Sequence, residues 1–200
     1  MECRWLDFEH RHKVSTIVCV FEVLLGCFIL LQCSPIPSND VIIVTFRWRS
    51  HPPPLTVPRQ EWYQHECIAD LYCLGIFKDD GVASLRDLTG SHLPVLREML
   101  DQGPKAIEQI YGVPKDQIRI FVHYQPQFYH FHVHYTRLEN DIGAQVEKAH
   151  LLSDIIQDLE VDPDCFQRKT MTYKLSLKDK LYHVLKHHEN DVSEEEKQQN

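Results

Sequence analysis

Apolar positions recur with helical spacing in three stretches of the chain. Residues 65–78 are largely apolar and predict a buried helix. Leucines and isoleucines at intervals of three and four predict a second helix over 93–110, with an N-cap at Thr89 or Ser91 and a kink at Gly103-Pro104. A third helix is predicted over 146–159, ending at Asp162-Pro163. The side chains expected to face inward from this third helix are Leu151, Leu152, Ile155, Ile156 and Leu159.

Strict alternation of side-chain character predicts two strands between the second and third helices. Residues 118–124 and 129–135 both alternate, and Gln125-Pro126-Gln127 between them predicts a turn. Further along the chain, residues 173–177 predict a late strand and residues 181–185 a terminal helix. Helices and strands are therefore segregated around a tight hairpin, which is typical of an α+β fold with an antiparallel sheet.

Three parts with different composition follow one another along the chain. Residues 1–57 contain an apolar run at 17–32 and a Pro-rich linker at 50–58, residues 58–188 carry the orderly pattern, and residues 189–200 form an acidic tail that we expect to be disordered. The run at 17–32 is shorter than the ~18–20 residues of a membrane span, and acidic residues precede it. These features favour a buried element, or a leader that is not native to the protein, over a signal or membrane anchor. Membrane association stays open.

Composition limits the classes of function. The chain has 200 residues, of which 43% are hydrophobic, so it is long enough to bury a core. Its 21 Lys and Arg against 29 Asp and Glu give a charge of -8, which argues against binding to duplex nucleic acid through surface charge. Seven cysteines without a C-x-x-C pair indicate a reducing compartment. The 13 histidines draw attention because imidazole serves as nucleophile, acid–base group and metal ligand.

A row of histidines occupies the second predicted strand. Side chains at alternate positions of a strand share one face, so His130, His132 and His134 are predicted to line one surface while the residues between them pack into the core. With Tyr124 and Tyr129 flanking the turn, His123 lies opposite His130 on the same face.

Three interpretations of this row remain open on the residues alone. It can be a structural or solvated cluster, it can bind a metal ion, or it can supply a nucleophile. No acidic residue follows the row before Glu139, so the carboxylate partners that metal-bound histidines usually have are missing nearby. A neutral imidazole can attack phosphorus without a metal, and His132 is the natural nucleophile because a histidine stands on each side of it.

The residues around the row resemble a known family. His130-Phe131-His132-Val133-His134-Tyr135 is similar to the histidine-triad signature of nucleotide hydrolases and transferases, and the wider chain resembles the scavenger mRNA decapping enzymes. The resemblance covers roughly residues 58–188. The blocks that carry it are Ser84-Leu85-Arg86-Asp87-Leu88, His92-Leu93-Pro94, Arg119 to Tyr135, Val146-Glu147-Lys148-Ala149-His150-Leu151-Leu152, Leu159-Glu160 and Asp162-Pro163.

The resemblance implies a histidine-triad fold and hydrolysis of the residual 7-methylguanosine cap dinucleotide, or of short capped oligonucleotides, without cofactor or metal. It implies that His132 is the nucleophile that forms a nucleotidyl intermediate, with His130 and His134 as its partners. It further implies a homodimer located in the cytoplasm or nucleus. The substrate-binding residues that it implies are His123, Tyr124, Gln125, Pro126, Gln127, Phe128, Tyr129, Phe131, Val133 and Lys148.

Several positions depart from the family pattern. Pro58-Arg59-Gln60-Glu61-Trp62 stands where the family has an Asp and a Lys that contact the cap, so both charges are reversed. Phe128 replaces a Tyr, Gln127 replaces a small hydroxyl residue, and residues 1–57 do not resemble the family's N-terminal lid domain. Two alternatives therefore stay open beside the hydrolase. One is a catalytically impaired paralogue or fragment that binds cap or nucleotide, and the other is a metal-binding protein that uses the same histidine row.

Overall fold

The first of two compact units of the chain contains a six-stranded antiparallel sheet. The computed structural model describes residues 34–35, 41–47, 66–141 and 143–186, and the two units are residues 1–170 and 171–200. Each pair of neighbouring strands in the sheet is antiparallel, and helices are packed with it, which confirms the predicted α+β fold. The apolar run at 17–32, the predicted boundary at 57–58 and the predicted tail at 189–200 lie outside the described residues.

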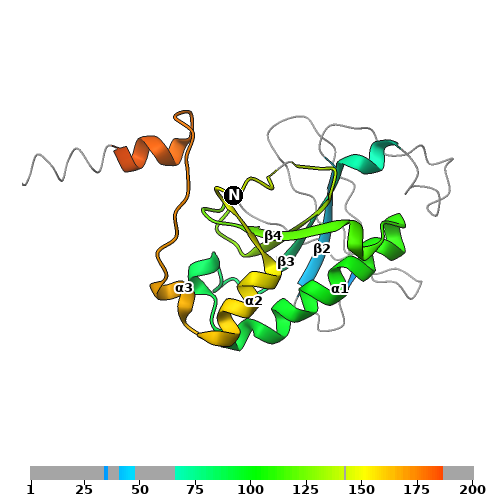
Figure 1. The fold of residues 1–200 in the computed structure, drawn as a ribbon, viewed down its shortest axis with the longest axis horizontal. Coiled ribbons are helices and arrows are strands. Elements are labelled where there is room, and N and C mark those ends of the chain that lie inside the picture. Colours follow the sequence, from blue (N-terminus) through cyan, green and yellow to red (C-terminus); the bar gives the residue numbers. More distant parts are fainter. Residues whose placement is uncertain (1–33, 36–40, 48–65, 142, 187–200) are drawn as a thin grey trace, which may run out of the picture. The chain divides into compact units, whose positions relative to one another are not determined.

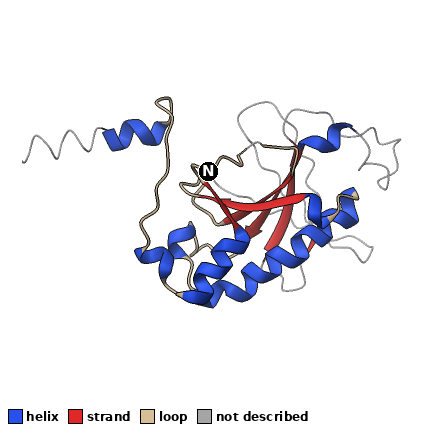
Figure 2. Ribbon diagram, viewed as in Figure 1, coloured by secondary structure: helices blue, strands red, loops and turns tan. Residues whose placement is uncertain are grey.

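The sheet and its helices are arranged as two layers (Figures 1 and 2). The strand order is β1-β2-β3-β5-β4-β6, and α1 and α2 contact each other beside the sheet. The strands are β1 (Ser34–Pro35), β2 (Val41–Arg47), β3 (Leu71–Phe77), β4 (Ile118–His123), β5 (His132–Arg137) and β6 (Ala149–Leu151). The helices are α1 (Leu93–Tyr111), α2 (Leu152–Val161) and α3 (Cys165–Arg168), with short 3-10 helices at Glu66–Asp70, Leu85–Asp87, Gly90–His92 and Lys115–Gln117.

The helix predicted over residues 65–78 is wrong. Only Glu66–Asp70 is helical, as a 3-10 turn, and the remainder forms β3 between β2 and β5. Burial alternates along β3, with its odd-numbered residues fully buried and its even-numbered residues partly so. Both faces of β3 carry apolar side chains and are at least partly buried, so its sequence lacks the polar alternation that distinguishes a strand from a buried helix.

Helix α1 packs closely on the sheet through Tyr135. The helix runs from Leu93 through Gly103-Pro104 to Tyr111, as the sequence predicted, and the N-cap is His92 in place of Thr89 or Ser91. The Tyr135 hydroxyl donates to the Met99 carbonyl oxygen at 2.8 Å. A Cβ added at Gly103 would lie 2.5 Å from that hydroxyl oxygen. The absent side chain at position 103 therefore lets the tyrosine ring fit between strand and helix.

The third predicted helix begins six residues later than expected. Residues Ala149–Leu151 form β6, which pairs with β4, and α2 begins at Leu152. Four of the five inward-facing residues are buried as predicted, whereas Leu151 is 47% exposed. Pairing with the edge of β4 satisfies the backbone of residues 149–151, and this long-range partner cannot be recognised from helical spacing.

The central hairpin forms, but with a different register and a longer loop. The predicted pairing would place Phe121 opposite His132, whereas the structure pairs Phe121 with His134, two residues further along β5. Strand β5 also begins at His132, so His130 lies in the loop before it. The loop is drawn toward β3, because the Phe131 carbonyl oxygen accepts from the Phe77 amide at 3.1 Å. Because side chains alternate along a strand, a shift of two residues in the pairing of β4 with β5 leaves the histidines on the predicted face.

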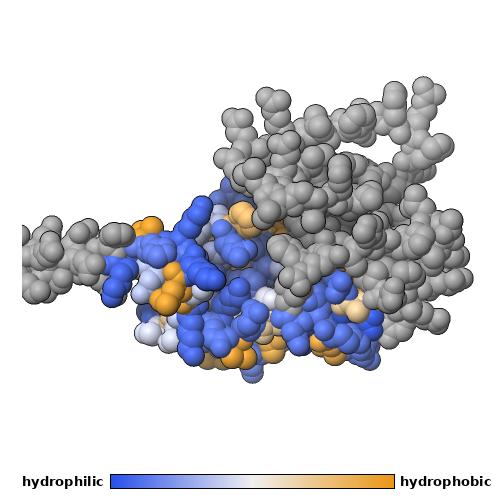
Figure 3. Space-filling view, turned by 90° about the horizontal axis from the view of Figure 1, so that it is seen from above, coloured by the Kyte–Doolittle hydropathy of each residue, from blue (hydrophilic) through white to orange (hydrophobic). Residues whose placement is uncertain are grey.

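The second unit contains one helix among its described residues, at 180–186, as the sequence predicted. The strand predicted over 173–177 is wrong, because residues 171–176 pair with no strand in the described part of the chain. None of the helices described is long and apolar enough to span a membrane. On the face shown in Figure 3 the described surface is mainly hydrophilic, with scattered apolar side chains.

Candidate active site

The His132 ring has a defined tautomer. Its Nδ1 lies 2.7 Å from the His130 carbonyl oxygen. A carbonyl oxygen can only accept, so Nδ1 carries the proton and Nε2 keeps its lone pair. Burial lowers the pKa of His132 below its ordinary value, and the nearby His130 lowers it further, against the opposing effect of the hydrogen bond. The ring is therefore neutral near pH 7, with a free lone pair on Nε2.

His134 is the most enclosed histidine of the row. Its side chain is 3% exposed, its Nδ1 is hydrogen-bonded to the Tyr72 hydroxyl, and its ring lies 4.8 Å from that of His132 between centroids. Burial holds the pKa of His134 well below its ordinary value, and His123, His132 and Lys148 lower it further. Within the described residues its Nε2 has no hydrogen-bond partner. A buried imidazole nitrogen thus remains without a partner next to His132.

His123, at the end of β4, joins the row from the neighbouring strand. Its ring centroid lies 4.1 Å from that of His134, and its Nε2 donates to the Gly143 carbonyl oxygen at 2.6 Å. Burial lowers the pKa of His123 to about 4, although the bond to Gly143 opposes this effect. Gly143 has a φ of 78°, a conformation that residues with a side chain rarely adopt, and an added Cβ would lie 3.1 Å from the His123 ring.

His130 lies at the rim of the site. Its Nε2 donates to the Phe77 carbonyl oxygen at 2.5 Å, and its Nδ1 lies 3.6 Å from the carboxylate of Asp80. The His130 side chain is 37% exposed and that of Asp80 is 97% exposed, so this ion pair is weakened by solvent. Sequence analysis predicted a row of three on one strand. The structure places His132 and His134 on β5 and His130 beside them, held by the end of β3.

The predicted substrate-binding loop divides into exposed and buried residues. Phe128 and Tyr129 are exposed, and the Tyr129 hydroxyl donates to the Gln125 side chain at 2.6 Å. Phe131 and Val133 were predicted to contact substrate, but both are fully buried in the core, so only their backbone could reach a ligand. The remaining loop residues differ in burial. Tyr124 is buried, Pro126 is partly buried and Gln127 is exposed.

Lys148 brings positive charge to the histidines. It lies in the turn before β6, so the position in a first helical turn that the sequence suggested is wrong. Its carbonyl oxygen accepts from the Tyr124 amide at 2.8 Å, which fixes the turn against the end of β4. Its charge contributes to lowering the pKa of both His123 and His134. An ammonium group in this position can stabilise negative charge that develops on a phosphate.

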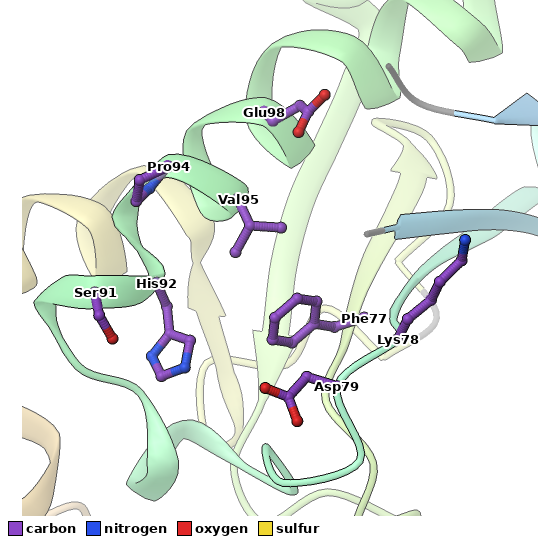
Figure 4. A pocket seen from close by; sticks show the side chains of 8 residues that line it. All are labelled: Phe77, Lys78, Asp79, Ser91, His92, Pro94, Val95 and Glu98. Atoms are coloured by element: carbon purple, nitrogen blue, oxygen red, sulfur yellow. The ribbon is translucent and has the colours of Figure 1, made fainter. Parts of the chain in front are cut away.

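A cavity of about 530 Å³ lies between the end of β3 and the start of α1 (Figure 4), and His123, His130, His132 and His134 do not line it. The rings of Phe77 and His92 meet edge to face there, with centroids 6.1 Å apart. Its charged lining side chains are two carboxylates and one lysine, which do not favour a triphosphate. The lining residues are Phe77, Lys78, Asp79, Ser91, His92, Pro94, Val95 and Glu98.

Three histidines of the site each direct a ring nitrogen at a backbone carbonyl group. His130, His132 and His123 each donate to a backbone oxygen. The described residues contain no group of three or more His, Cys, Asp or Glu placed to hold one metal ion. The cysteines described, Cys73 and Cys165, are both free thiols. The arrangement in this part of the chain therefore offers imidazoles with fixed tautomers, and burial lowers the pKa of His132 so that its ring is neutral, as nucleophilic attack on phosphorus requires.

Comparison with known proteins agrees with this chemistry. Residues 59–150 match the family described as scavenger mRNA decapping enzyme C-term binding. This part of the chain is thus similar to the scavenger mRNA decapping family. An m7GpppX diphosphatase of Sus scrofa is 45% identical over 130 residues, and that of Homo sapiens is 44% identical; each match covers 64% of this chain and 38% of the relative. The Schizosaccharomyces pombe m7GpppX diphosphatase is 29% identical over 133 residues, covering 66% of this chain and 43% of the relative. The chain thus spans about two fifths of the relatives' length.

Sequence analysis missed the residues that orient the four histidines of the site. These are Tyr72, Phe77, Asp80, Phe121 and Gly143. Tyr72 was missed because its segment was interpreted as a helix. Interpreted as a strand, the segment would have placed Tyr72 on one face together with Leu74 and Ile76. Gly143 gave a weak signal, as a single glycine in a polar loop.

Proposed function

We propose that this chain hydrolyses the triphosphate bridge of a 7-methylguanosine cap dinucleotide, or of short capped oligonucleotides. The observation that carries the proposal is the hydrogen bond from His132 Nδ1 to the His130 carbonyl oxygen, because it leaves a lone pair on Nε2 of a neutral ring. Relatives named m7GpppX diphosphatase supply the substrate class.

The reaction proceeds in two displacements at one phosphorus atom. His132 Nε2 attacks the phosphorus next to 7-methylguanosine, a nitrogen–phosphorus bond forms, and the bridging phosphorus–oxygen bond breaks to release a nucleoside diphosphate. The His132 ring is then an imidazolium, whose Nδ1–H remains bonded to the His130 carbonyl oxygen. Water attacks the same phosphorus, releases 7-methyl-GMP and restores the neutral ring. One water is consumed for each cap cleaved.

Positive charge and hydrogen-bond donors surround the position of the phosphates. The ammonium of Lys148 and the ring of His134 lie on the histidine face, where they can stabilise charge on the non-bridging oxygens. The exposed residues Phe128 and Tyr129 stand at the loop beside the row, where aromatic side chains can contact a base.

The test is product formation by the full chain. Cap dinucleotide is incubated with the protein and 7-methyl-GMP is measured by chromatography, while the covalent nucleotidyl intermediate is sought by mass spectrometry after acid-free quenching. His132→Asn should lower the rate by at least about 10³-fold. His183→Asn, in the helix of the second unit, is the matched control and should retain full activity. Equal activity of wild type and His132→Asn contradicts the proposal.

A second candidate is binding of cap or nucleotide without turnover. Glu61, where the family has Lys, favours it because a carboxylate repels the triphosphate. A rise in melting temperature with cap dinucleotide, together with no product at high enzyme concentration, would identify this function. Glu61→Lys should then increase the affinity for the cap.

We further propose that the chain acts as a homodimer, as the family resemblance implies. Light scattering coupled to size-exclusion chromatography tests this proposal. A mass near twice 23.6 kDa is expected, and a mass of one chain at assay concentration contradicts it.

A further inference from the structure

Backbone carbonyl groups fix the tautomers of three histidines in the site, but not that of the fourth. A carbonyl oxygen only accepts, so the ring nitrogen facing it must carry the proton. The three pairs are His130 Nε2 with Phe77, His132 Nδ1 with His130 and His123 Nε2 with Gly143. His134 Nδ1 instead faces the Tyr72 hydroxyl, which can donate or accept. The position of its proton therefore depends on the direction of that one hydrogen bond.

A count of unsatisfied groups decides the direction. If the hydroxyl of Tyr72 donates to His134 Nδ1, one polar group of this pair is left without a partner among the described residues, the Nε2–H of His134. If His134 Nδ1 donates instead, two groups are left: the hydroxyl hydrogen of Tyr72 and the Nε2 lone pair. Each buried unsatisfied group costs about 1–3 kcal/mol, so donation by Tyr72 is favoured.

We propose that Tyr72 is a positioning residue that holds His134 with its proton on Nε2, so that this N–H donates to a non-bridging oxygen of the phosphoryl group under attack. The identity of that acceptor rests on the proposed function. His134 lies beside the nucleophile, with 4.8 Å between the ring centroids of His132 and His134, and its Nε2 is buried without a partner in the described structure. A buried donor of this kind is satisfied when an anionic oxygen arrives.

The ionisation of both partners is consistent with this hydrogen bond. Burial raises the pKa of the Tyr72 hydroxyl above its ordinary value, so the hydroxyl keeps its proton. Burial lowers the pKa of His134 well below its ordinary value, so the ring is neutral near pH 7 and has a single N–H. A protonated donor therefore faces a neutral ring, and Tyr72 selects which nitrogen of that ring bears hydrogen.

The direct test is nuclear magnetic resonance of the full chain labelled with ¹⁵N-histidine near pH 7. The chemical shifts of Nδ1 and Nε2 report which nitrogen is protonated, and His134→Asn assigns the signals. In the wild type we expect Nε2 protonated and Nδ1 as an acceptor. In Tyr72→Phe the His134 signals should move toward the other tautomer or a mixture. Tyr182→Phe, which also removes a hydroxyl from a tyrosine that contacts a histidine ring, is the control and should leave them unchanged.

Kinetics provides a second readout. Tyr72→Phe should lower kcat for cap cleavage by about 10- to 100-fold while KM changes by less than about twofold. A wild-type spectrum with the His134 proton on Nδ1 overturns the proposal, and so does a Tyr72→Phe spectrum identical to that of wild type. Absence of cap cleavage by wild type contradicts the proposed function alone, because the tautomer is measured in the free protein without substrate.

Discussion

The ring of His134 stacks on the ring of Phe121, with centroids 5.0 Å apart and 10° between the planes. Phe121 is fully buried and lies directly opposite His134 in the pairing of β4 with β5. The sheet register therefore places a flat apolar surface under one histidine of the site. This contact orients the ring plane, and the Tyr72 hydroxyl fixes its rotation within that plane.

Replacing Phe121 by Leu removes the stacked surface. We expect a loss of about 1–2 kcal/mol in the free energy of unfolding from the smaller side chain, and a fall in kcat because the His134 ring gains freedom. Urea denaturation and steady-state kinetics measure the two effects. Phe166→Leu is the control, since Phe166 is similarly buried but lies in α3; it should cost similar stability and leave kcat unchanged. Unchanged kcat in Phe121→Leu contradicts the orienting role.

A side chain at position 143 should disturb His123. Gly143→Ala places a Cβ 3.1 Å from the His123 ring on a backbone with φ of 78°. We expect a loss of about 1–3 kcal/mol in stability and a lower kcat/KM, because the ring must shift away from its hydrogen bond. Ala144→Ser adds one atom at the next position without this conflict and should behave as wild type. Equal melting temperatures for wild type and Gly143→Ala would refute the constraint.

Stability should fall in mild acid. The pKa of folded His123 is about 4, whereas that of an unfolded histidine is near 6.5, so the unfolded chain binds more protons between these values. The free energy of unfolding therefore decreases as pH falls from about 6.5 to about 4, by about 2 kcal/mol from His123 alone. His132 and His134 are shifted in the same direction and steepen the decrease. Denaturation at several pH values measures it, and His123→Gln should flatten the curve.

Arg86 connects the site loop to α3. Its Nε donates to the Tyr124 hydroxyl at 3.0 Å, and its Nη1 donates to the carbonyl oxygens of Phe166 and Lys169. Arg86→Lys cannot make all three bonds, so we expect a loss of about 1–2 kcal/mol in stability and a several-fold fall in kcat/KM. Arg97→Lys alters an exposed pair with Glu160 and should change neither quantity measurably. If both variants behave alike, Arg86 does not support the loop.

The sequence predicted those parts of the fold that depend on local pattern. Helix α1, the central hairpin and the helix at 180–186 follow from spacing over neighbouring residues. The errors arise where a partner distant in sequence determines the secondary structure or the register. Strand β3 is apolar on both faces and pairs with β2 and β5, which are distant in sequence, and β6 exists because β4 offers an edge. The register of the hairpin was two residues off because Phe131 pairs with Phe77 across the sheet before β5 begins.

For the site, too, the sequence predicted the local pattern and missed the long-range partners. The row of His130, His132 and His134 was visible because its chemistry is carried by residue type at alternate positions. The groups that fix the rings were not visible, because most are backbone carbonyls, which every residue has. Only the three-dimensional path of the loops at 77–80 and 143 determines which carbonyl meets which histidine.

Strand β5 divides its side chains between two tasks. His132 and His134 face the site, while Val133 and Tyr135 are buried in the core. A slip of one residue in its pairing would bury the histidines and expose the core residues, since side chains alternate along a strand. The proposed activity therefore requires this strand to be correctly aligned. Active-site titration of a refolded sample would count the fraction of chains with native strand alignment, a quantity that circular dichroism cannot distinguish.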